Sequence, residues 1–227
     1  MAVVKKDKAI VLVSGGMDSS LTAAYAFKKY ELAFLHVNYG QRTEKRELKA
    51  FNDIAKYYKV KDKLIVDIGY LKKIGGSSLT DRKLKVTKAN IESKKIPTSY
   101  VPFRNANILG IATSWAEVIG AKRIFIGAVE EDSSGYPDCR KTFFDAYNDV
   151  IRFGTKNSSN IKIETPIINY TKKQIVEKAI KMKVPLHLTW SCYKSNTLAC
   201  GDCDSCALRL RGFRNAGYKD PIKYKKL

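Results

Sequence analysis

Ser14-Gly15-Gly16-Met17-Asp18-Ser19-Ser20 joins an apolar run to an amphipathic segment near the start of the chain. Residues 9–14 are too few for a helix and are rich in Ile and Val, which predicts a buried parallel strand. Residues 19–30 then place apolar side chains at helical spacing. Adjacent glycines let a backbone approach an anion closely, and the N–H groups of such a turn converge on phosphate with the positive end of the next helix. The stretch therefore predicts a phosphate-binding loop between a strand and a helix.

Strand and helix patterns alternate along the rest of the chain, interrupted by an irregular segment at residues 69–101. Buried strands that alternate with amphipathic helices predict right-handed crossovers and a doubly wound parallel α/β sheet. Thr171 is the predicted N-cap of the last helix in this alternation. An irregular segment as long as 69–101 inside a compact domain is usually functional or mobile. The further strands are predicted at residues 32–37, 64–68, 123–127 and 161–164, and the further helices at 44–58, 106–119, 140–153 and 171–182.

The composition describes a basic protein with enough apolar residues for a core. The 227 residues are 44% hydrophobic and 11% aromatic, which excludes a disordered chain. Lys+Arg number 42 against 22 Asp+Glu, a net charge of +20 that suits nucleic acid, an anionic membrane or a polyanionic small substrate. Lysines outnumber arginines and are spread over the whole chain, whereas Arg is the better residue for bidentate recognition of phosphate. The charge therefore favours a generally basic surface over a dedicated nucleic-acid groove.

The sequence predicts a cytoplasmic protein that does not enter a membrane. No stretch approaches the roughly 18 apolar residues of a spanning helix. The first apolar run is too short for a signal peptide, and the glycine loop follows where a cleavage site is expected. Four of the five cysteines fall within residues 192–206. In a reducing compartment this clustering favours a metal site over a disulfide framework.

The clustered cysteines have the spacing of metal ligands, C-x7-C-x2-C-x2-C at Cys192, Cys200, Cys203 and Cys206. C-x-x-C pairs let a short loop supply two thiolates, and four thiolates complete a tetrahedral Zn²⁺ site. Zinc is favoured over an iron–sulfur cluster, which four cysteines also hold, and over disulfides. With four thiolate ligands the zinc is expected to be structural. The composition shifts at residue 189, so we predict an α/β nucleotide-binding domain at residues 1–188 and a zinc module with a basic tail at 189–227.

The glycine loop is neither a Walker loop nor a dinucleotide fingerprint, because G-x-x-x-x-G-K-[ST] and G-x-G-x-x-G are both missing. The alternative without a ligand is a tight strand-to-helix turn. The pattern S-G-G-x-D-S resembles the pyrophosphate loop of the ATP pyrophosphatase (N-type) superfamily. That resemblance implies binding of the β,γ-pyrophosphate of ATP and adenylation of a substrate oxygen at the α-phosphate. The ATP-binding residues that it implies are Val13, Ser14, Gly15, Gly16, Met17, Asp18, Ser19, Ser20, Leu21, Thr22 and Ala23.

Further stretches resemble one family of that superfamily, the 7-cyano-7-deazaguanine synthases, over residues 9–217. The Gly-Tyr-Pro-Asp-Cys-Arg and four-cysteine blocks look specific to it. The family usually has Asp-Tyr-Gly-Gln-Arg-His where this chain has Asn38 and Thr43 at the two ends, so no acid or base role is expected there. The stretches are Asn38-Tyr39-Gly40-Gln41-Arg42, Tyr100-Val101-Pro102-Phe103-Arg104-Asn105, Asp132-Ser133-Ser134-Gly135-Tyr136-Pro137-Asp138-Cys139-Arg140, Glu164-Thr165-Pro166 and Thr189-Trp190-Ser191-Cys192-Tyr193.

The resemblance implies a ligase that uses ATP with Mg²⁺ to convert 7-carboxy-7-deazaguanine and ammonia into the nitrile. The carboxylate would be adenylated, ammonia would give the amide, and a second adenylation would let the amide oxygen leave. The resemblance also implies a homodimer, small-molecule partners and a place in queuosine or archaeosine biosynthesis, with no need for direct nucleic-acid binding. Two alternatives remain: a tRNA-modifying enzyme of the same loop class, for thiolation or lysidine formation, and a zinc-stabilised RNA-binding module with a vestigial loop.

Polar residues near predicted turns are candidates for contacts with substrate. Arg104 and Arg140 would bind phosphate or carboxylate, with surface ion pairing as the alternative. Asp132 and Asp138 would hold Mg²⁺ or accept from guanine-like N–H groups, with loop capping as the alternative.

Aromatic and sulfur side chains supply the remaining candidates. Tyr136 and Trp190 would stack on the deazapurine, or pack in the core. Cys139 is either a nucleophile or a buried apolar thiol. His36 and His187 lie in no metal-binding pattern and are assigned no chemistry.

Overall fold

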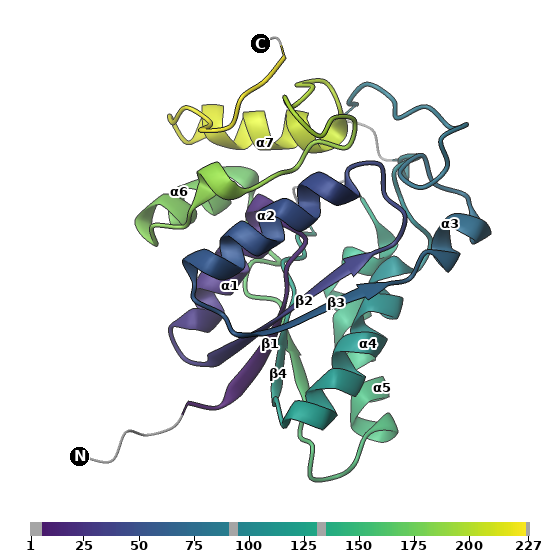
Figure 1. Cartoon of the computed structure of the whole chain (residues 1–227), viewed down its shortest axis with the longest axis vertical. Coiled ribbons are helices and arrows are strands. Elements are labelled where there is room, and N and C mark those ends of the chain that lie inside the picture. The colour runs from purple at the N-terminus through teal and green to yellow at the C-terminus, as the bar shows by residue number, and fades with distance from the viewer. Residues whose placement is uncertain (1–5, 91–94, 131–134, 226–227) are drawn as a thin grey trace.

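The structure, a computed structural model, describes residues 6–90, 95–130 and 135–225. Its centre is one parallel sheet in the order β3-β2-β1-β4-β5, seen edge-on in Figure 1. The doubly wound α/β fold predicted from the sequence is therefore confirmed, with a strand at each of the predicted positions. The strands are β1 (Lys8–Leu12), β2 (Glu31–Asn38), β3 (Asp62–Asp67), β4 (Arg123–Phe125) and β5 (Lys162–Glu164).

Helices cover both faces of the sheet. One apolar cluster joins α1, α2 and α6 to one face, and a second joins α4 and α5 to the other. Figure 1 shows α7 in yellow stacked on α6, beyond α1 and α2. The α-helices are α1 (Met17–Phe27), α2 (Glu44–Tyr57), α3 (Tyr70–Ile74), α4 (Arg104–Ile119), α5 (Lys141–Gly154), α6 (Lys172–Lys181) and α7 (Asp204–Asn215), and the short 3₁₀ helices are η1 (Pro137–Cys139) and η2 (Leu186–Leu188).

The burial of β1 explains its continuous apolar run. Ala9 and Val11 pack into the α1–α2 cluster, while Ile10 and Leu12 pack into the α4–α5 cluster, so successive side chains meet a helix on each face. The edge strand β3 instead alternates half-buried and exposed residues. The glycine loop therefore follows a strand that is packed on both faces.

Helix α6 begins with the predicted cap. Thr171 Oγ1 accepts from the backbone N–H of Gln174 at 3.2 Å, and the Gln174 side chain accepts from the Thr171 N–H at 2.8 Å. This reciprocal capping box satisfies two backbone donors that a helix start otherwise leaves free. The N-cap prediction is confirmed.

The sequence pattern missed α3, α7 and both 3₁₀ helices. Helix α7 begins between two of the cysteines, where the pattern was interpreted only as metal-ligand spacing. Helix α4 begins at Arg104, two residues before its predicted start, because a side chain from another segment caps it (described below). Such tertiary contacts leave no local signal.

The irregular segment at 69–101 is fastened to the sheet by one arginine. Arg42 lies just beyond β2 and donates from Nε to the carbonyl of Ser78 at 2.7 Å, and from Nη2 to the carbonyls of Asp81 and Leu84 at 2.9 and 2.6 Å. Farther along, the amide of Ala89 donates to the carbonyl of Asp202 at 2.9 Å. The segment thus bridges β2 and the cysteine region.

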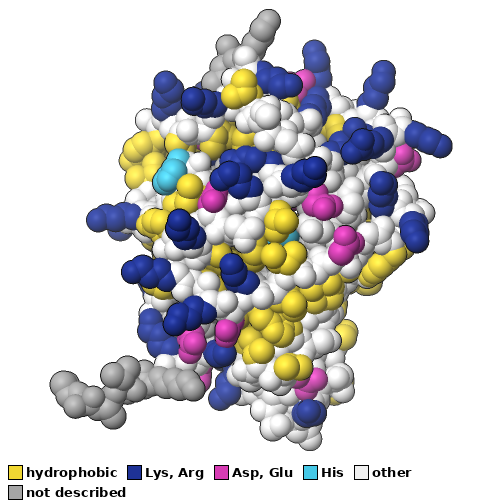
Figure 2. All heavy atoms as spheres, viewed as in Figure 1, with side chains coloured by type: hydrophobic (Ala, Val, Ile, Leu, Met, Phe, Trp, Pro, Cys, Tyr) yellow, Lys and Arg dark blue, Asp and Glu magenta, His cyan; other side chains and the backbone are white. Residues whose placement is uncertain are grey.

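Charge is spread over the surface. On the face in Figure 2, Lys and Arg side chains are scattered among apolar and acidic ones and form no single stripe. None of the helices in the described parts of the chain is both long and apolar enough to cross a membrane.

Candidate active site

A cleft of about 270 Å³ opens at the carboxyl ends of β1, β2 and β4. The strand order reverses between β1 and β4, and helices leave the sheet there toward opposite faces. Ligands of doubly wound sheets bind at such a switch point. The position of the cleft therefore follows from the topology before any side chain is considered.

The glycine loop forms one wall of the cleft and is folded tightly on itself. Gly15 has φ +90°, and a Cβ there would lie 2.8 Å from the carbonyl oxygen of Glu47 and 2.9 Å from Cβ of Ala50. Gly16 N–H donates to Ser14 Oγ at 3.2 Å, and Ser19 Oγ donates to the Gly16 carbonyl at 3.1 Å. Glycine at 15 is required both by the backbone angle and by the close approach of α2.

The loop presents part of its predicted ATP-binding set to the cleft. Gly15 shapes the loop without lining the cavity. Ser20, Leu21, Thr22 and Ala23 are buried in α1, away from the cavity wall. The residues that line it are Val13, Ser14, Gly16, Met17, Asp18 and Ser19.

A lysine that the sequence pattern did not single out reaches this loop from α6. Lys172 Nζ lies 2.6 Å from Asp18 Oδ2, and the lysine side chain is only 9% exposed. The other oxygen, Asp18 Oδ1, is buried without a hydrogen-bond partner among the described residues. A carboxylate oxygen left free beside the glycine loop has the hard donor chemistry that Mg²⁺ prefers. Asp18 therefore fits a magnesium ligand.

The opposite wall carries a second cation. Arg104, the first residue of α4, donates from Nη1 to Tyr39 Oη at 3.3 Å, and its guanidinium lies 5.2 Å from the centre of that ring. The Tyr136 ring centre is 6.0 Å away. Burial raises the pKa of Tyr39, which stays a neutral phenol. Arg104 thus faces the cleft amid uncharged aromatic groups.

Asp138 caps the helix that carries Arg104. Its Oδ2 accepts from the backbone N–H of Asn105 at 2.9 Å, and Asn105 Nδ2 donates back to the Asp138 carbonyl at 2.8 Å. Asp138 is 3% exposed and does not line the cleft. The structure thus places it in the capping arrangement, and the negative charge at the N-terminus of α4 is favourable.

The neighbours of Asp138 have different surroundings. Cys139 lines the cleft, and its Sγ accepts from Asn105 Nδ2 at 3.3 Å. Burial raises the pKa of the Cys139 thiol to about 11, so it is protonated at neutral pH. Arg140 is exposed and precedes α5, away from the cavity wall. Asp132 lies outside the described residues.

A smaller cavity of about 150 Å³ adjoins the cleft beyond Arg104. Tyr136 lines it and donates to Ser99 Oγ at 2.9 Å. Tyr193 lines both cavities and was not among the sequence candidates. The signal that could have found it is its place at the end of the stretch Thr189-Trp190-Ser191-Cys192-Tyr193, which carries the family resemblance.

The four clustered cysteines fit one metal ion. Their sulfur atoms all lie within 4.8 Å of one another. Tetrahedral ligands at about 2.3 Å from zinc are about 3.8 Å apart, and Cys200 and Cys206 Sγ are 3.8 Å apart. The amides of Lys194 and Cys200 both donate to Cys192 Sγ at 3.3 Å, a contact that favours a thiolate. All five cysteines are free, so no disulfide competes for these sulfurs.

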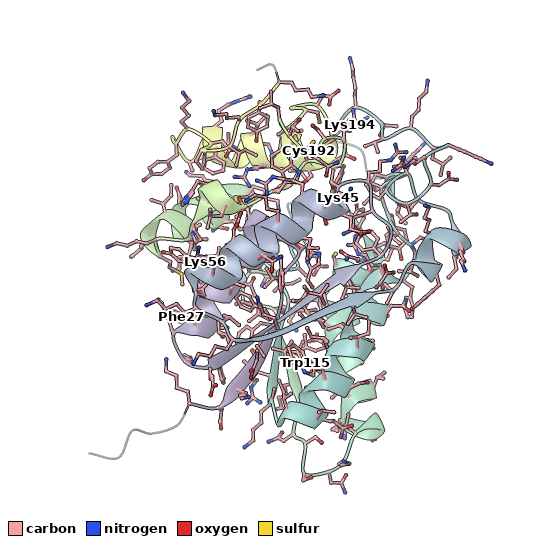
Figure 3. The ribbon with its side chains drawn as sticks, viewed as in Figure 1. Phe27, Lys45, Lys56, Trp115, Cys192 and Lys194 are labelled. Carbon is pink, nitrogen blue, oxygen red and sulfur yellow. The ribbon has the colours of Figure 1, made fainter. Side chains whose placement is uncertain are left out.

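The cysteine region contacts the glycine loop directly. The amide of Trp190 donates to the carbonyl of Gly15 at 2.8 Å, and Arg46 of α2 stacks on the Trp190 ring at 4.5 Å. Figure 3 shows Cys192 next to the N-terminal end of α2, near Lys45. Trp190 is 3% exposed, with its indole N–H bonded to the Ser195 carbonyl at 3.1 Å. The four-cysteine cluster and the glycine loop are therefore neighbours.

Polar groups at the end of β2 complete the cleft. His36 Nδ1 lies 2.9 Å from the Val13 carbonyl oxygen, and Nε2 lies 3.1 Å from Asn38 Oδ1, so the ring joins β1 to β2. Glu47 accepts from Thr43 Oγ1 at 2.6 Å, and burial raises the pKa of this carboxyl group. Asn38 and Thr43 are thus structural partners of His36 and Glu47.

Comparison with known proteins gives a single family. The model of the family described as queuosine biosynthesis protein QueC matches residues 8–217. A 7-cyano-7-deazaguanine synthase from Chloroherpeton thalassium is 59% identical to this chain, over 96% of the chain and 97% of that protein. The proteins of the same name from Chlorobium phaeobacteroides strain DSM 266 and Chlorobaculum tepidum are 59% and 56% identical, each over 96% of both chains.

Proposed function

The chain belongs to the queuosine biosynthesis protein QueC family, and on that premise we propose that it is a 7-cyano-7-deazaguanine synthase. It joins ammonia to 7-carboxy-7-deazaguanine and forms the nitrile with ATP as the activating reagent. One observation carries the assignment beyond sequence similarity. The cleft places the backbone of the glycine loop opposite a half-buried cation that lies beside two tyrosine rings. The backbone N–H groups of the loop suit the triphosphate. A cation beside aromatic rings suits a flat anionic acid.

The reaction runs through two adenylations. The carboxylate oxygen attacks the α-phosphorus of ATP, and pyrophosphate leaves. Ammonia displaces AMP from the acyl adenylate and gives the amide after losing a proton. The amide oxygen attacks a second ATP, and loss of AMP with that oxygen and of the remaining N–H protons gives the nitrile. The protein supplies position and charge.

Residues of the loop hold the pyrophosphate while the α-phosphate faces the cleft. The N–H groups after β1 and the N-terminus of α1 supply donors and a positive field. Lys172, already beside Asp18 at 2.6 Å, adds the positive charge that the loop lacks. Asp18 would hold Mg²⁺, which when bound neutralises charge on the leaving pyrophosphate.

The other candidate residues divide between contact and support. Arg104, Tyr136 and Cys139 form the substrate wall, and the raised thiol pKa supports a non-nucleophilic role for Cys139. Asp138 supports Arg104 through the start of α4. Asp132 and Arg140 remain candidates for contacts made from the segment before α5.

Zinc held by Cys192, Cys200, Cys203 and Cys206 has a structural role in this proposal, in a module of residues 189–227 that follows an ATP-binding domain of residues 1–188. The sulfur spacing and the link from Trp190 to Gly15 support that role. We further propose a cytoplasmic homodimer that needs no nucleic acid. Val118 on α4 and Phe153 on α5 are 82% and 76% exposed, which supports contact with a second copy there. The product would serve queuosine or archaeosine biosynthesis.

The assignment is tested with ATP, Mg²⁺, ammonium and 7-carboxy-7-deazaguanine. AMP and 7-cyano-7-deazaguanine are expected by mass spectrometry. Asp18→Ala should lower AMP formation by roughly 1,000-fold or more, because it removes the carboxylate beside the phosphates, while bound zinc measured by elemental analysis stays at one per chain. Asp145→Ala on the surface of α5 is the matched control. Turnover with unmodified tRNA and none with the deazapurine would overturn the assignment in favour of a tRNA-modifying enzyme.

A further inference from the structure

Two cations beside the adjoining cavities are in opposite situations: Arg104 lines both cavities, and Lys172 lines the smaller one. Lys172 forms an ion pair with Asp18 of the glycine loop. Arg104 takes part in none of the ion pairs formed within residues 6–90, 95–130 and 135–225, and its described side-chain hydrogen bond goes to the neutral Tyr39 hydroxyl. Arg104 is half-buried, and withdrawing a guanidinium from water without a carboxylate partner is costly. A cation left in this state beside a cavity is suited to an anionic group from outside the protein.

Two carboxyl groups interact electrostatically with Arg104, and both are engaged elsewhere. Glu47 accepts from Thr43 Oγ1 at 2.6 Å. Asp138 Oδ2 accepts from the Asn105 amide at the start of α4. Burial raises the pKa of Asp138, and the hydrogen bond from the Asn105 amide opposes that rise. Asp138 therefore holds the helix end in place and leaves the guanidinium of Arg104 turned to the cavity.

Arg104 lies where the two cavities meet. The larger cavity includes Ser14 and Gly16 of the glycine loop, the smaller one includes Tyr136 and Leu208, and Arg104 lines both. In an adenylation the acceptor oxygen must approach the α-phosphate at the boundary between the nucleotide and the acceptor. The guanidinium occupies that boundary.

The surroundings of Arg104 fit a flat ring with one charged substituent. Tyr39 and Tyr136 flank the guanidinium, and Tyr193 lines the smaller cavity together with Tyr136. These neutral phenols offer faces for stacking and few charges. The carboxylate is the only negative group on the acid substrate, whereas the amide and the nitrile have none.

Resting on the proposed function, we propose that Arg104 binds the 7-carboxylate of the substrate and makes the cleft prefer the charged acid over the neutral nitrile. The guanidinium forms charge-assisted hydrogen bonds to the acid and an ordinary hydrogen bond to the amide oxygen. The nitrile can accept neither kind of hydrogen bond. Binding to the protein therefore weakens when the nitrile forms, which is when the product must leave. Arg104 contacts substrate throughout and forms no covalent bond.

Calorimetric titration of the acid, the amide and the nitrile tests this without turnover. The wild-type protein should bind the acid roughly 30-fold or more tightly than the nitrile, the range for a buried charge pair. Arg104→Gln should abolish that preference and leave nitrile affinity within about threefold, because only the charge-dependent contact is lost. Arg104→Lys keeps the positive charge but loses the paired N–H donors of the guanidinium. It should therefore retain part of the preference for the acid. Arg152→Gln on the surface of α5 is the matched control and should behave as wild type.

Steady-state kinetics separates the carboxylate from the phosphates. Arg104→Gln should raise the KM for the acid by roughly 30-fold or more, with the KM for ATP changed less than about threefold. Equal losses for all three ligands, or a rise in the KM for ATP instead, would overturn the proposal. So would a wild-type protein that prefers the nitrile. If Arg104→Gln does not fold, an undiminished preference in Arg104→Lys overturns it. A wild-type protein that prefers the acid but forms no AMP would instead refute the proposed function.

Discussion

The glycine loop and the Arg104 wall face each other across one cleft but are built in different ways. The loop is a contiguous stretch in which backbone groups and two glycines do the shaping. The Arg104 wall brings side chains together from the end of β2, the start of α4, η1 and the cysteine region. In the proposed function the backbone of the glycine loop would bind the triphosphate, the substrate that enzymes using ATP have in common. An acceptor that differs between enzymes is recognised by side chains, which substitution changes easily.

The largest effect is expected from breaking the backbone wall at Gly15. Gly15→Ala adds a Cβ at φ +90° and within 2.9 Å of α2, so the loop or the helix must move. We expect AMP formation to fall more than roughly 100-fold and the free energy of unfolding to fall by about 2–4 kcal/mol. Activity assays and urea denaturation measure the two effects.

A matched glycine separates the two causes. Gly120 ends α4 at φ +68°, and an added Cβ meets nothing within 4 Å. Gly120→Ala should cost about 1 kcal/mol from backbone strain alone and leave AMP formation unchanged. Equal effects of the two substitutions would show that close packing of α2 is not what the loop requires.

The protonation state of Cys139 tests whether the Arg104 wall is free of negative charge. Because burial raises the Cys139 pKa to about 11, its thiolate fraction at pH 8 should be roughly 100-fold below that of an ordinary cysteine. Alkylation followed by peptide mapping should be slow at pH 8 and accelerate as pH rises toward 11. Urea-unfolded protein supplies the reference rate. Fast alkylation at pH 8 would contradict a protonated thiol. Loss of activity in Cys139→Ser would contradict a non-nucleophilic role for Cys139.

Metal removal tests whether the two walls depend on a common support. Ser191 and Tyr193 flank Cys192 and line the cleft, and Trp190 is hydrogen-bonded to Gly15. Loss of the metal should weaken ATP binding by about tenfold, the value of one buried hydrogen bond with its partner left unsatisfied. Calorimetry with ATP after chelation measures the loss, and restored affinity on adding Zn²⁺ excludes irreversible unfolding. An unchanged affinity for ATP would show that the glycine loop keeps its structure without the metal.

The smallest effect is expected at Tyr39. The Tyr39 hydroxyl accepts from Arg104 over 3.3 Å, a long contact to a cation whose charge stays in place. Tyr39→Phe should therefore raise the KM for the acid only about two- to threefold. Tyr57→Phe, which removes an exposed hydroxyl bonded to the Lys183 carbonyl, is the control. A tenfold rise would mean that Tyr39 orients the guanidinium.

The same contrast explains how much could be predicted from sequence. The strands, the glycine loop and the cysteine cluster are contiguous, so hydrophobic period and spacing indicate them directly. Lys172 has no such signal, because it meets Asp18 only after α6 packs against α1. Tyr193 and Glu47 likewise enter the cleft through tertiary packing.

Capping shows the limit on a smaller scale. Thr171 and Gln174 lie in one turn, and the sequence predicts that cap correctly. The cap of α4 comes from Asp138, a residue far along the chain, and the predicted start of that helix was late by two residues.

The hydrogen bond from the Trp190 amide to the Gly15 carbonyl also orders events in time. Gly15 leaves the ribosome long before Trp190 does. At about 5–20 residues per second, roughly 9 to 35 seconds separate the two during synthesis. Through that interval the glycine loop lacks one of its hydrogen bonds, and β1 lacks its partner β4 for much of it. The glycine loop therefore acquires its full set of hydrogen bonds only after the cysteine region has been made.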